Sequence, residues 1–191
     1  MVSFSYICSQ YHNDTQDAVR ARIKSRPERH NMKTIFCEFL DSQDKNGVIT
    51  IKPLGQAKNR ISKPMLPGWE DVTTKIVIDK KFAAGLDGIE DYSHVTIVYW
   101  MDKEKECHLK HHPQGREDVP FVGIFACRCP QRPNRIAIST VKLAGRKGNI
   151  ITVKGLDIIN GTPVLDIKPY ASQYDKVDKV RVPDWVNKLV F

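Results

Sequence analysis

The densest group of reactive side chains in the sequence is the nine-residue stretch CRCPQRPNR, residues 127–135. Its arginines, Arg128, Arg132 and Arg135, supply planar donors that suit carboxylate or phosphate groups. Asn134 adds a donor and an acceptor that can recognise the edge of a base. The two prolines of the stretch remove amide donors and fix the backbone, so it must be a stiff loop. Such a loop suits a binding site, although an ordinary exposed basic turn has the same composition.

A second group lies in GLDIINGTPVLDIKPY, residues 155–170. NGTP is a strong turn signal between two strand-like runs. After the turn, Asp166 and Lys168 alternate with apolar residues, so both project from one face of the same strand. The pair is either a simple ion pair on the sheet or part of a site that handles a proton or an anion.

Two further segments contain residues with possible chemistry. His94 begins a strand-like run and Asp102 follows it, although a lone histidine is more often structural than catalytic. CHLKHHP, residues 107–113, has metal-ligand residue types, but its spacing matches no zinc pattern. We expect 107–113 to be an exposed loop, and we expect no metal site.

Short alternating or apolar runs, bounded by Gly, Pro, Asn and Asp, must position these side chains. The expected strands are 48–55, 74–79, 94–101, 121–128, 137–144, 149–158 and 164–170. Only KKFAAGL and GIEDY suit helical turns between them, and AGRKGN (144–149) suits a hairpin turn whose Arg and Lys point to water. The pattern predicts a mainly β protein, a small, mostly antiparallel β-barrel, rather than a doubly wound fold.

The 191 residues are enough for one domain with appendages, and the formal charge of +8 favours an anionic partner such as nucleic acid. The longest apolar run, VTIVYW, is too short to cross a membrane, and the N-terminus lacks a signal-peptide pattern. The five cysteines form no CxxC pair, which predicts reduced thiols in a cytoplasmic protein. We expect a basic N-terminal extension with a short helix or arm over 1–47 and the barrel domain over 48–191. Met32 suits a first residue as well as a continuation.

GIFACRCPQRPNRIAISTVKL, followed by LDIINGTPVLDIKPY, strongly resembles the TsaA-like, or YaeB, family of TrmO-type tRNA methyltransferases. The family patterns are roughly GVFATRSPxRPNPIGLSxVxL and D(G)TPVLDIKPY. The resemblance extends through GLDGIEDYSHVTIVYWM and LPGWEDV and covers about residues 48 to 186.

The resemblance implies a small barrel that binds S-adenosyl-L-methionine without a Rossmann fold. It implies methyl transfer to the exocyclic N6 of threonylcarbamoyladenosine, the modified base beside the anticodon of certain tRNAs. It also implies a homodimer with the cofactor site near the subunit boundary.

The resemblance assigns roles residue by residue. The implied cofactor-binding residues are Pro67, Gly68, Trp69, Asp102, Arg128, Ile138 and the stretch from Asp157 to Asn160. The candidate catalytic residues are His94, Asp166 and Lys168, with Asp166 or His94 taking the proton. The candidate substrate-binding residues are Arg132, Asn134, Arg135 and Tyr170.

The sequence departs from the family pattern at four positions. Cys127 and Cys129 stand where the pattern has Thr and Ser, which removes hydroxyls but keeps size. Arg135 replaces a proline and Asn160 replaces an aspartate, so both changes favour anion binding. The departures leave two alternatives to tRNA methylation: methyl transfer to another nucleoside or small molecule, and a non-catalytic RNA-binding barrel. The sequence shows no interleaved aromatic platform of the RRM kind for the latter.

Overall fold

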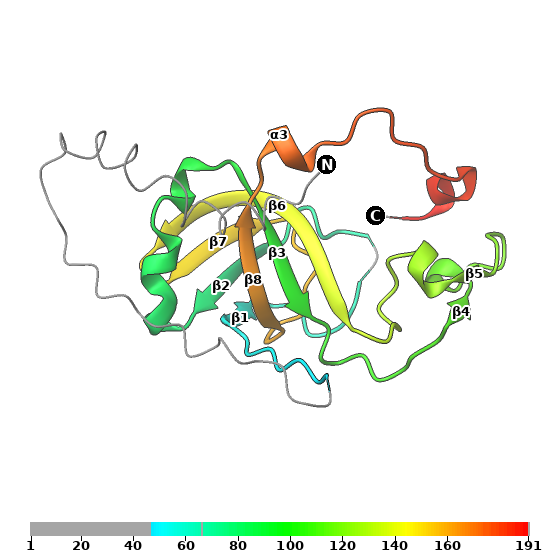
Figure 1. Cartoon of the computed structure of the whole chain (residues 1–191), viewed down its shortest axis with the longest axis horizontal. Coiled ribbons are helices and arrows are strands. Elements are labelled where there is room, and N and C mark those ends of the chain that lie inside the picture. Colours follow the sequence, from blue (N-terminus) through cyan, green and yellow to red (C-terminus); the bar gives the residue numbers. More distant parts are fainter. Residues whose placement is uncertain (1–46, 66, 191) are drawn as a thin grey trace, which may run out of the picture. The chain divides into compact units, whose positions relative to one another are not determined.

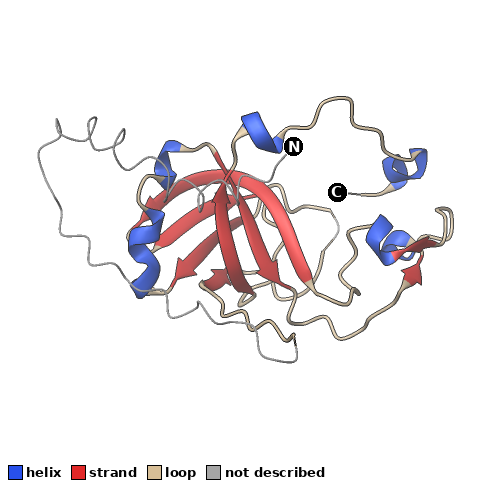
Figure 2. Ribbon diagram, viewed as in Figure 1, coloured by secondary structure: helices blue, strands red, loops and turns tan. Residues whose placement is uncertain are grey.

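The computed structural model describes residues 47–65 and 67–190. Six strands form a closed barrel (Figures 1 and 2) in the order β1-β2-β7-β6-β3-β8, and every pair, including β8 with β1, is antiparallel. The strands are β1 (Gly55–Lys58), β2 (Thr73–Ile78), β3 (His94–Trp100), β6 (Ile136–Lys147), β7 (Ile150–Lys154) and β8 (Pro163–Pro169). The prediction of a mainly β, small-barrel fold is confirmed.

The barrel interior is filled by β-branched residues at alternating strand positions, as the pleat of a strand requires. On β3, Val95 and Ile97 are fully buried and Tyr99 is 5% exposed, whereas His94 on the other face is exposed. Fully buried residues of the other strands complete this core: Ala57, Ile76, Ile151, Val153 and Val164. The other face of β3 and its neighbours carries both polar and apolar residues, among them His94, Val98 and Ile138.

Three expected strands differ from the observed ones; one of them is 149–158, where β7 ends at Lys154. Residues 48–54 are almost entirely outside strands, and β1 begins at Gly55; Pro53 has no amide proton for a ladder. Of 121–128, only Val122–Gly123 (β5) is a strand, paired with β4 (Lys110–His111). The chain then turns into the 3-10 helix η4 (Ile124–Ala126).

The short helices include both predicted helical turns, η1 (Lys80–Leu86) and η2 (Ile89–Asp91). The others are η3 (Pro113–Gly115), α3 (Ser172–Asp175) and η5 (Asp184–Lys188). Within the described part of the chain, no helix combines the length and apolar character needed to span a membrane. Residues 1–46 lie outside the described residues, so the extension and its helix stay predictions.

Arg146 of β6 binds the helix η1 to the barrel through hydrogen bonds. Its guanidinium donates to Asp87 at 2.7 Å and to the carbonyls of Ala83 and Leu86 at 3.3 and 3.0 Å, and its side chain is only 16% exposed. The expectation that this arginine points to water is wrong, because the ends of short helices offer carbonyls that need donors.

Candidate active site

Predicted cofactor-binding residues meet at the end of the barrel where β3 finishes. Asp102 is the second residue after β3, and the next residue, Lys103, donates from Nζ to the carbonyl of Asn160 at 3.1 Å. The side-chain oxygen of Asn160 accepts from the backbone N–H of Asn59 at 3.2 Å. These bonds bring Asp102 and Asn160, which are far apart in the sequence, to the same end of the barrel.

Tyr99, which is 5% exposed, lies at this end of the barrel. Its hydroxyl donates to the backbone carbonyl of Asp157 at 2.7 Å, and Ser139 Oγ lies 3.2 Å away. Burial raises the pKa of Tyr99 to about 12, so the phenol stays protonated at neutral pH. The charge of Arg128 has the smallest of four influences on this pKa, a weak lowering, and the pKa of Asp157 shows no influence of Arg128.

The carboxyl of Asp157 is partly desolvated. The residue as a whole is exposed, but the protein atoms around its carboxyl raise its pKa by desolvation. The ionised form is therefore less favourable here than in water. A cation beside Asp157 would lower its pKa again, because an opposite charge favours the ionised carboxylate.

The turn formed by Pro67, Gly68 and Trp69 packs against the segment that leads to Asp157. Trp69 is 8% exposed and donates from Nε1 to the carbonyl of Met65 at 2.8 Å. Gly68 has a φ of 112°, which favours glycine. Three residues after Trp69, the carbonyl of Val72 accepts from the Gly155 N–H at 3.0 Å. The turn is thus held to the strand end that precedes Asp157.

The cationic loop, residues 127–135, contains arginines that differ in burial and in hydrogen bonding. Arg132 is half-buried, and its Nη2 donates to the carbonyls of Ile124 and Cys127 at 3.0 and 2.8 Å. Among the described residues, its buried Nε has no hydrogen-bond partner. Arg128 and Asn134 are exposed. Arg132 therefore shapes the loop, which presents Arg128 and Asn134 outward.

A second group lies on the outer face of the barrel. Lys168 Nζ and Asp166 Oδ2 are 2.8 Å apart, and the Ile167 N–H donates to Asp166 Oδ1 at 2.8 Å. Asp166 pairs with Val98 of β3, and Val98 also pairs with Ile138 of β6. With neighbouring strands about 4.8 Å apart, Ile138 and Asp166 are about 10 Å from each other in one row.

His94 and Tyr170 occupy the opposite end of β3. Their rings make an edge contact with centroids 6.4 Å apart, and the Tyr170 N–H donates to the His94 carbonyl at 3.1 Å. Both line a shallow depression of about 360 Å³. His94 is six strand positions from Trp100, about 20 Å at 3.3 Å per residue. One chain alone therefore does not bring His94 to Asp102.

Several residues at the Asp102 end of the barrel were not assigned a role from the sequence. Asn59 donates from Nδ2 to the Ile158 carbonyl at 2.8 Å and to Thr74 Oγ1 at 3.0 Å, so it fixes the segment before Asn160. Lys103 and Ser139 are likewise identified only by their contacts with Asn160 and Tyr99. Sequence spacing gave no signal, because each partner lies on another strand or loop.

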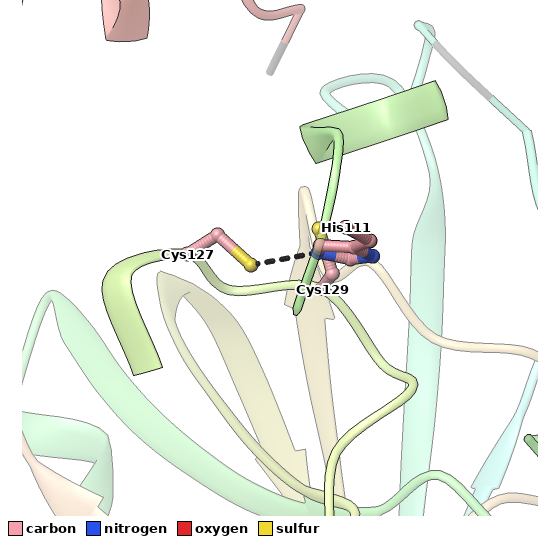
Figure 3. A group of neighbouring side chains, drawn as sticks. All are labelled: His111, Cys127 and Cys129. Carbon is pink, nitrogen blue, oxygen red and sulfur yellow. Dashed lines mark hydrogen bonds between the residues drawn. The ribbon is translucent and has the colours of Figure 1, made fainter. Parts of the chain in front are cut away.

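His111, Cys127 and Cys129 form a third group, in which His111 Nε2 lies 3.1 Å from Cys127 Sγ (Figure 3). Desolvation, followed by the charges of His108 and His112, lowers the pKa of His111. All three residues are half-buried, and Pro113 is buried. The expectation that 107–113 is entirely an exposed loop is wrong, because β4 turns His111 toward the cationic loop.

The fold and the site define a small closed-barrel protein with a cationic loop at one end of its barrel. Residues 55–176 match the family model described as the tRNA-methyltransferase O N-terminal domain. The chain belongs to this family, and the resemblance inferred from the sequence is confirmed.

The relatives agree with this assignment. The chain is 35% identical over 148 residues to a probable S-adenosyl-L-methionine-binding protein of Pyrococcus abyssi, covering 75% of this chain and 79% of the relative. It is 41% identical over 100 residues to the human tRNA (adenine(37)-N6)-methyltransferase, covering 51% of this chain but only 22% of the human protein. The crystal structure of TrmO from Pseudomonas aeruginosa matches with a TM-score of 0.56 and 27% identity, covering 69% of this chain and 60% of the solved one.

Proposed function

We propose that this protein is a cytoplasmic, S-adenosyl-L-methionine-dependent tRNA methyltransferase that methylates N6 of threonylcarbamoyladenosine beside the anticodon. Family membership and the names of the relatives support the class of reaction. The observation that carries the proposal is the meeting of motif residues at one end of the barrel, where the Tyr99 hydroxyl donates to the Asp157 carbonyl and Lys103, next to Asp102, donates to the Asn160 carbonyl.

The donor set fits S-adenosyl-L-methionine. That molecule has a carboxylate, an ammonium group and a sulfonium, so it needs both a cation and an anion from the protein. The guanidinium of Arg128 suits the carboxylate, and the partly desolvated carboxyl of Asp157 suits a positive group. The bound cofactor supplies an electrophilic methyl group on its positively charged sulfur. The task of the chain is to orient the acceptor amine and exclude water.

Asp166 is the residue that we assign to proton acceptance. An adenine amino group is a weak nucleophile, because its lone pair is delocalised into the ring, so the site must accept a proton during or after attack. Asp166 shares a row of the sheet with the predicted cofactor residue Ile138. Lys168 and the Ile167 N–H each contact one of its carboxylate oxygens, which fixes the orientation of the carboxylate.

A homodimer is the second part of the proposal. Large apolar side chains are exposed on and near the cationic loop: Phe125 is 82%, Leu109 71%, Phe121 60% and Ile138 52% exposed. Burial of such side chains against a second copy would be favourable. In a dimer, His94 and Tyr170 of one subunit would be able to contribute to the site of the other subunit.

Transfer of an isotopically labelled methyl group from S-adenosyl-L-methionine to bulk tRNA tests the proposal. The tRNA is prepared with and without the threonylcarbamoyl modification, and nucleosides are identified by mass spectrometry. Label only on threonylcarbamoyladenosine supports the proposal. Label on a different nucleoside changes the acceptor, and cofactor binding without label on either tRNA contradicts tRNA methylation. Absence of cofactor binding favours the RNA-binding alternative.

Asp157→Asn is expected to stabilise the free protein and to weaken cofactor binding. Burial raises the folded-state pKa of Asp157, so its ionised form reduces stability above that pKa and has no effect below the unfolded pKa of about 3.9. Urea unfolding should therefore show a gain at about pH 7 that disappears near about pH 3. Calorimetric titration should show about 10-fold weaker binding of S-adenosyl-L-methionine.

Asp71→Asn is the matched control for Asp157→Asn, because Asp71 is an exposed aspartate in the loop after Trp69. Asp71→Asn should change neither the stability to urea nor the affinity for S-adenosyl-L-methionine. If Asp157→Asn destabilises the free protein at neutral pH, the carboxylate is already paired and the assignment of Asp157 to a cationic ligand is incorrect.

A further inference from the structure

His111 lies against two cysteines of the cationic loop, of which Cys127 is 16 positions further along the chain (Figure 3). The ligand atoms of His111, Cys127 and Cys129 all lie within 4.8 Å of one another. His111 is the last residue of β4, Cys127 follows η4, and Cys129 is in the loop beyond it. The pairing of β4 with β5 brings His111 to the two thiols.

The spacing of these donors suits a tetrahedral metal ion. Zinc–sulfur bonds of about 2.3 Å and zinc–nitrogen bonds of about 2.0 Å place tetrahedral ligand atoms about 3.5–3.8 Å apart. His111 Nε2 and Cys127 Sγ are 3.1 Å apart, and no pair exceeds 4.8 Å. Small side-chain rotations would therefore bring all three donors to coordination distance.

A disulfide between the two cysteines is a poorer explanation. Only one residue, Arg128, separates the two cysteines, so a disulfide between them would close a small ring and strain its own geometry. Both thiols are free in the structure.

We propose that His111, Cys127 and Cys129 bind one divalent transition-metal ion of the zinc type. Two thiolates and an imidazole are soft or borderline ligands, which favour zinc over magnesium or calcium. Three protein ligands leave a fourth coordination position for water or another donor. Because the cysteines replace the Thr and Ser of the family pattern, the site is a property of this sequence and not of the family motif.

The metal would control the shape of the cationic loop. Cys127 and Cys129 flank Arg128, so one ion would fix the backbone on both sides of that arginine and join it to β4. This consequence rests on the proposed role of Arg128 in cofactor binding, whereas the metal site itself does not. A failure of methyl transfer would leave the metal proposal intact, because metal binding is measured directly.

The test uses the full chain, purified without a histidine tag. Metal content is measured by plasma mass spectrometry, and the protein stripped with a chelator is titrated with Co²⁺. We expect one zinc ion per chain, and a cobalt complex with a sulfur-to-metal charge-transfer band and the strong visible bands of tetrahedral cobalt. Each of the variants Cys127→Thr, Cys129→Ser and His111→Gln should lose the charge-transfer band or weaken Co²⁺ binding at least tenfold.

Matched controls come from the same segment. Cys107→Ser removes an exposed thiol and His108→Gln removes an exposed imidazole, and neither should change the cobalt spectrum. Cys8→Ser and Cys37→Ser control for the two cysteines outside the described residues. The proposal is overturned if the control substitutions abolish the cobalt spectrum while Cys127→Thr and Cys129→Ser leave it unchanged.

A measurement on the unaltered chain covers the case in which variants fail to fold. Zn²⁺ should protect Cys127 and Cys129 from alkylation, as read by peptide mass spectrometry, while Cys107 stays reactive. Equal labelling of Cys127 and Cys129 with and without Zn²⁺ contradicts the site. A chain isolated with these two cysteines joined by a disulfide, which takes up no cobalt after reduction, contradicts it as well.

Discussion

Arg128→Ala is expected to weaken binding of S-adenosyl-L-methionine by about 10- to 100-fold. A charge-assisted hydrogen bond contributes about 1.5–3 kcal/mol, and each 1.4 kcal/mol corresponds to a factor of about ten. The exposed guanidinium belongs to the loop that precedes β6, and the cofactor carboxylate has no other assigned partner. Isothermal titration calorimetry of the purified variant measures the effect.

Two variants test whether the effect comes from Arg128 itself. Arg128→Lys keeps the charge but loses the bidentate geometry, so its affinity should be intermediate. Arg181→Ala removes an exposed arginine outside the family match and should bind normally. Equal affinity of Arg128→Ala and the unaltered protein would assign the carboxylate to another cation and remove the main support for the proposed cofactor site.

Asp166→Asn is expected to lower kcat by about 100-fold or more, because general-base catalysis typically contributes a factor of about 10² to 10⁴. The amide keeps the shape of the carboxylate but does not accept the proton. Affinity for S-adenosyl-L-methionine should change by less than about twofold, since Asp166 is placed at the acceptor and not at the cofactor. Single-turnover methyl transfer to threonylcarbamoylated tRNA gives the rate, and calorimetry gives the affinity.

The control for Asp166→Asn is Asp178→Asn, which removes an exposed carboxylate whose ion pair with Lys176 is long, at 3.7 Å. Its kcat should be unchanged. Asp166→Glu should restore part of the rate if proton acceptance is the function of the residue. If Asp166→Asn instead raises KM for tRNA with kcat unchanged, the residue positions the substrate and the base is elsewhere.

The fold was largely predictable because strand alternation is a local property. The apolar pattern of 94–101 predicted a strand before the barrel was known, and the turn signals separated most of the strands correctly; the structure then showed Val95 and Ile97 on the inward face. The errors occurred where nonlocal groups compete for the backbone. At 124–126, the guanidinium of Arg132 binds the Ile124 carbonyl, and the chain forms η4 in place of a strand.

The candidate site was only partly predictable, because side-chain contacts depend on barrel closure. Asp157 and Arg128 were selected by motif, yet Tyr99, whose hydroxyl donates to the Asp157 carbonyl, was not, since its inward position is shared by ordinary core residues. The sequence also grouped His94 with Asp166 as alternative proton acceptors. Strand register separates the two residues along the sheet, because the Tyr170 N–H bonds to the His94 carbonyl whereas Asp166 pairs with Val98.

The sequence by itself determined the mainly β class, the stiff cationic loop and the family, because proline geometry, strand period and long motifs depend on neighbouring residues. Only the tertiary structure decided that Arg146 binds the short helices and that His111 meets Cys127 and Cys129. Those contacts join residues 16 to 63 positions apart. They form because closure of the barrel and the pairing of β4 with β5 fix distances that no local pattern encodes.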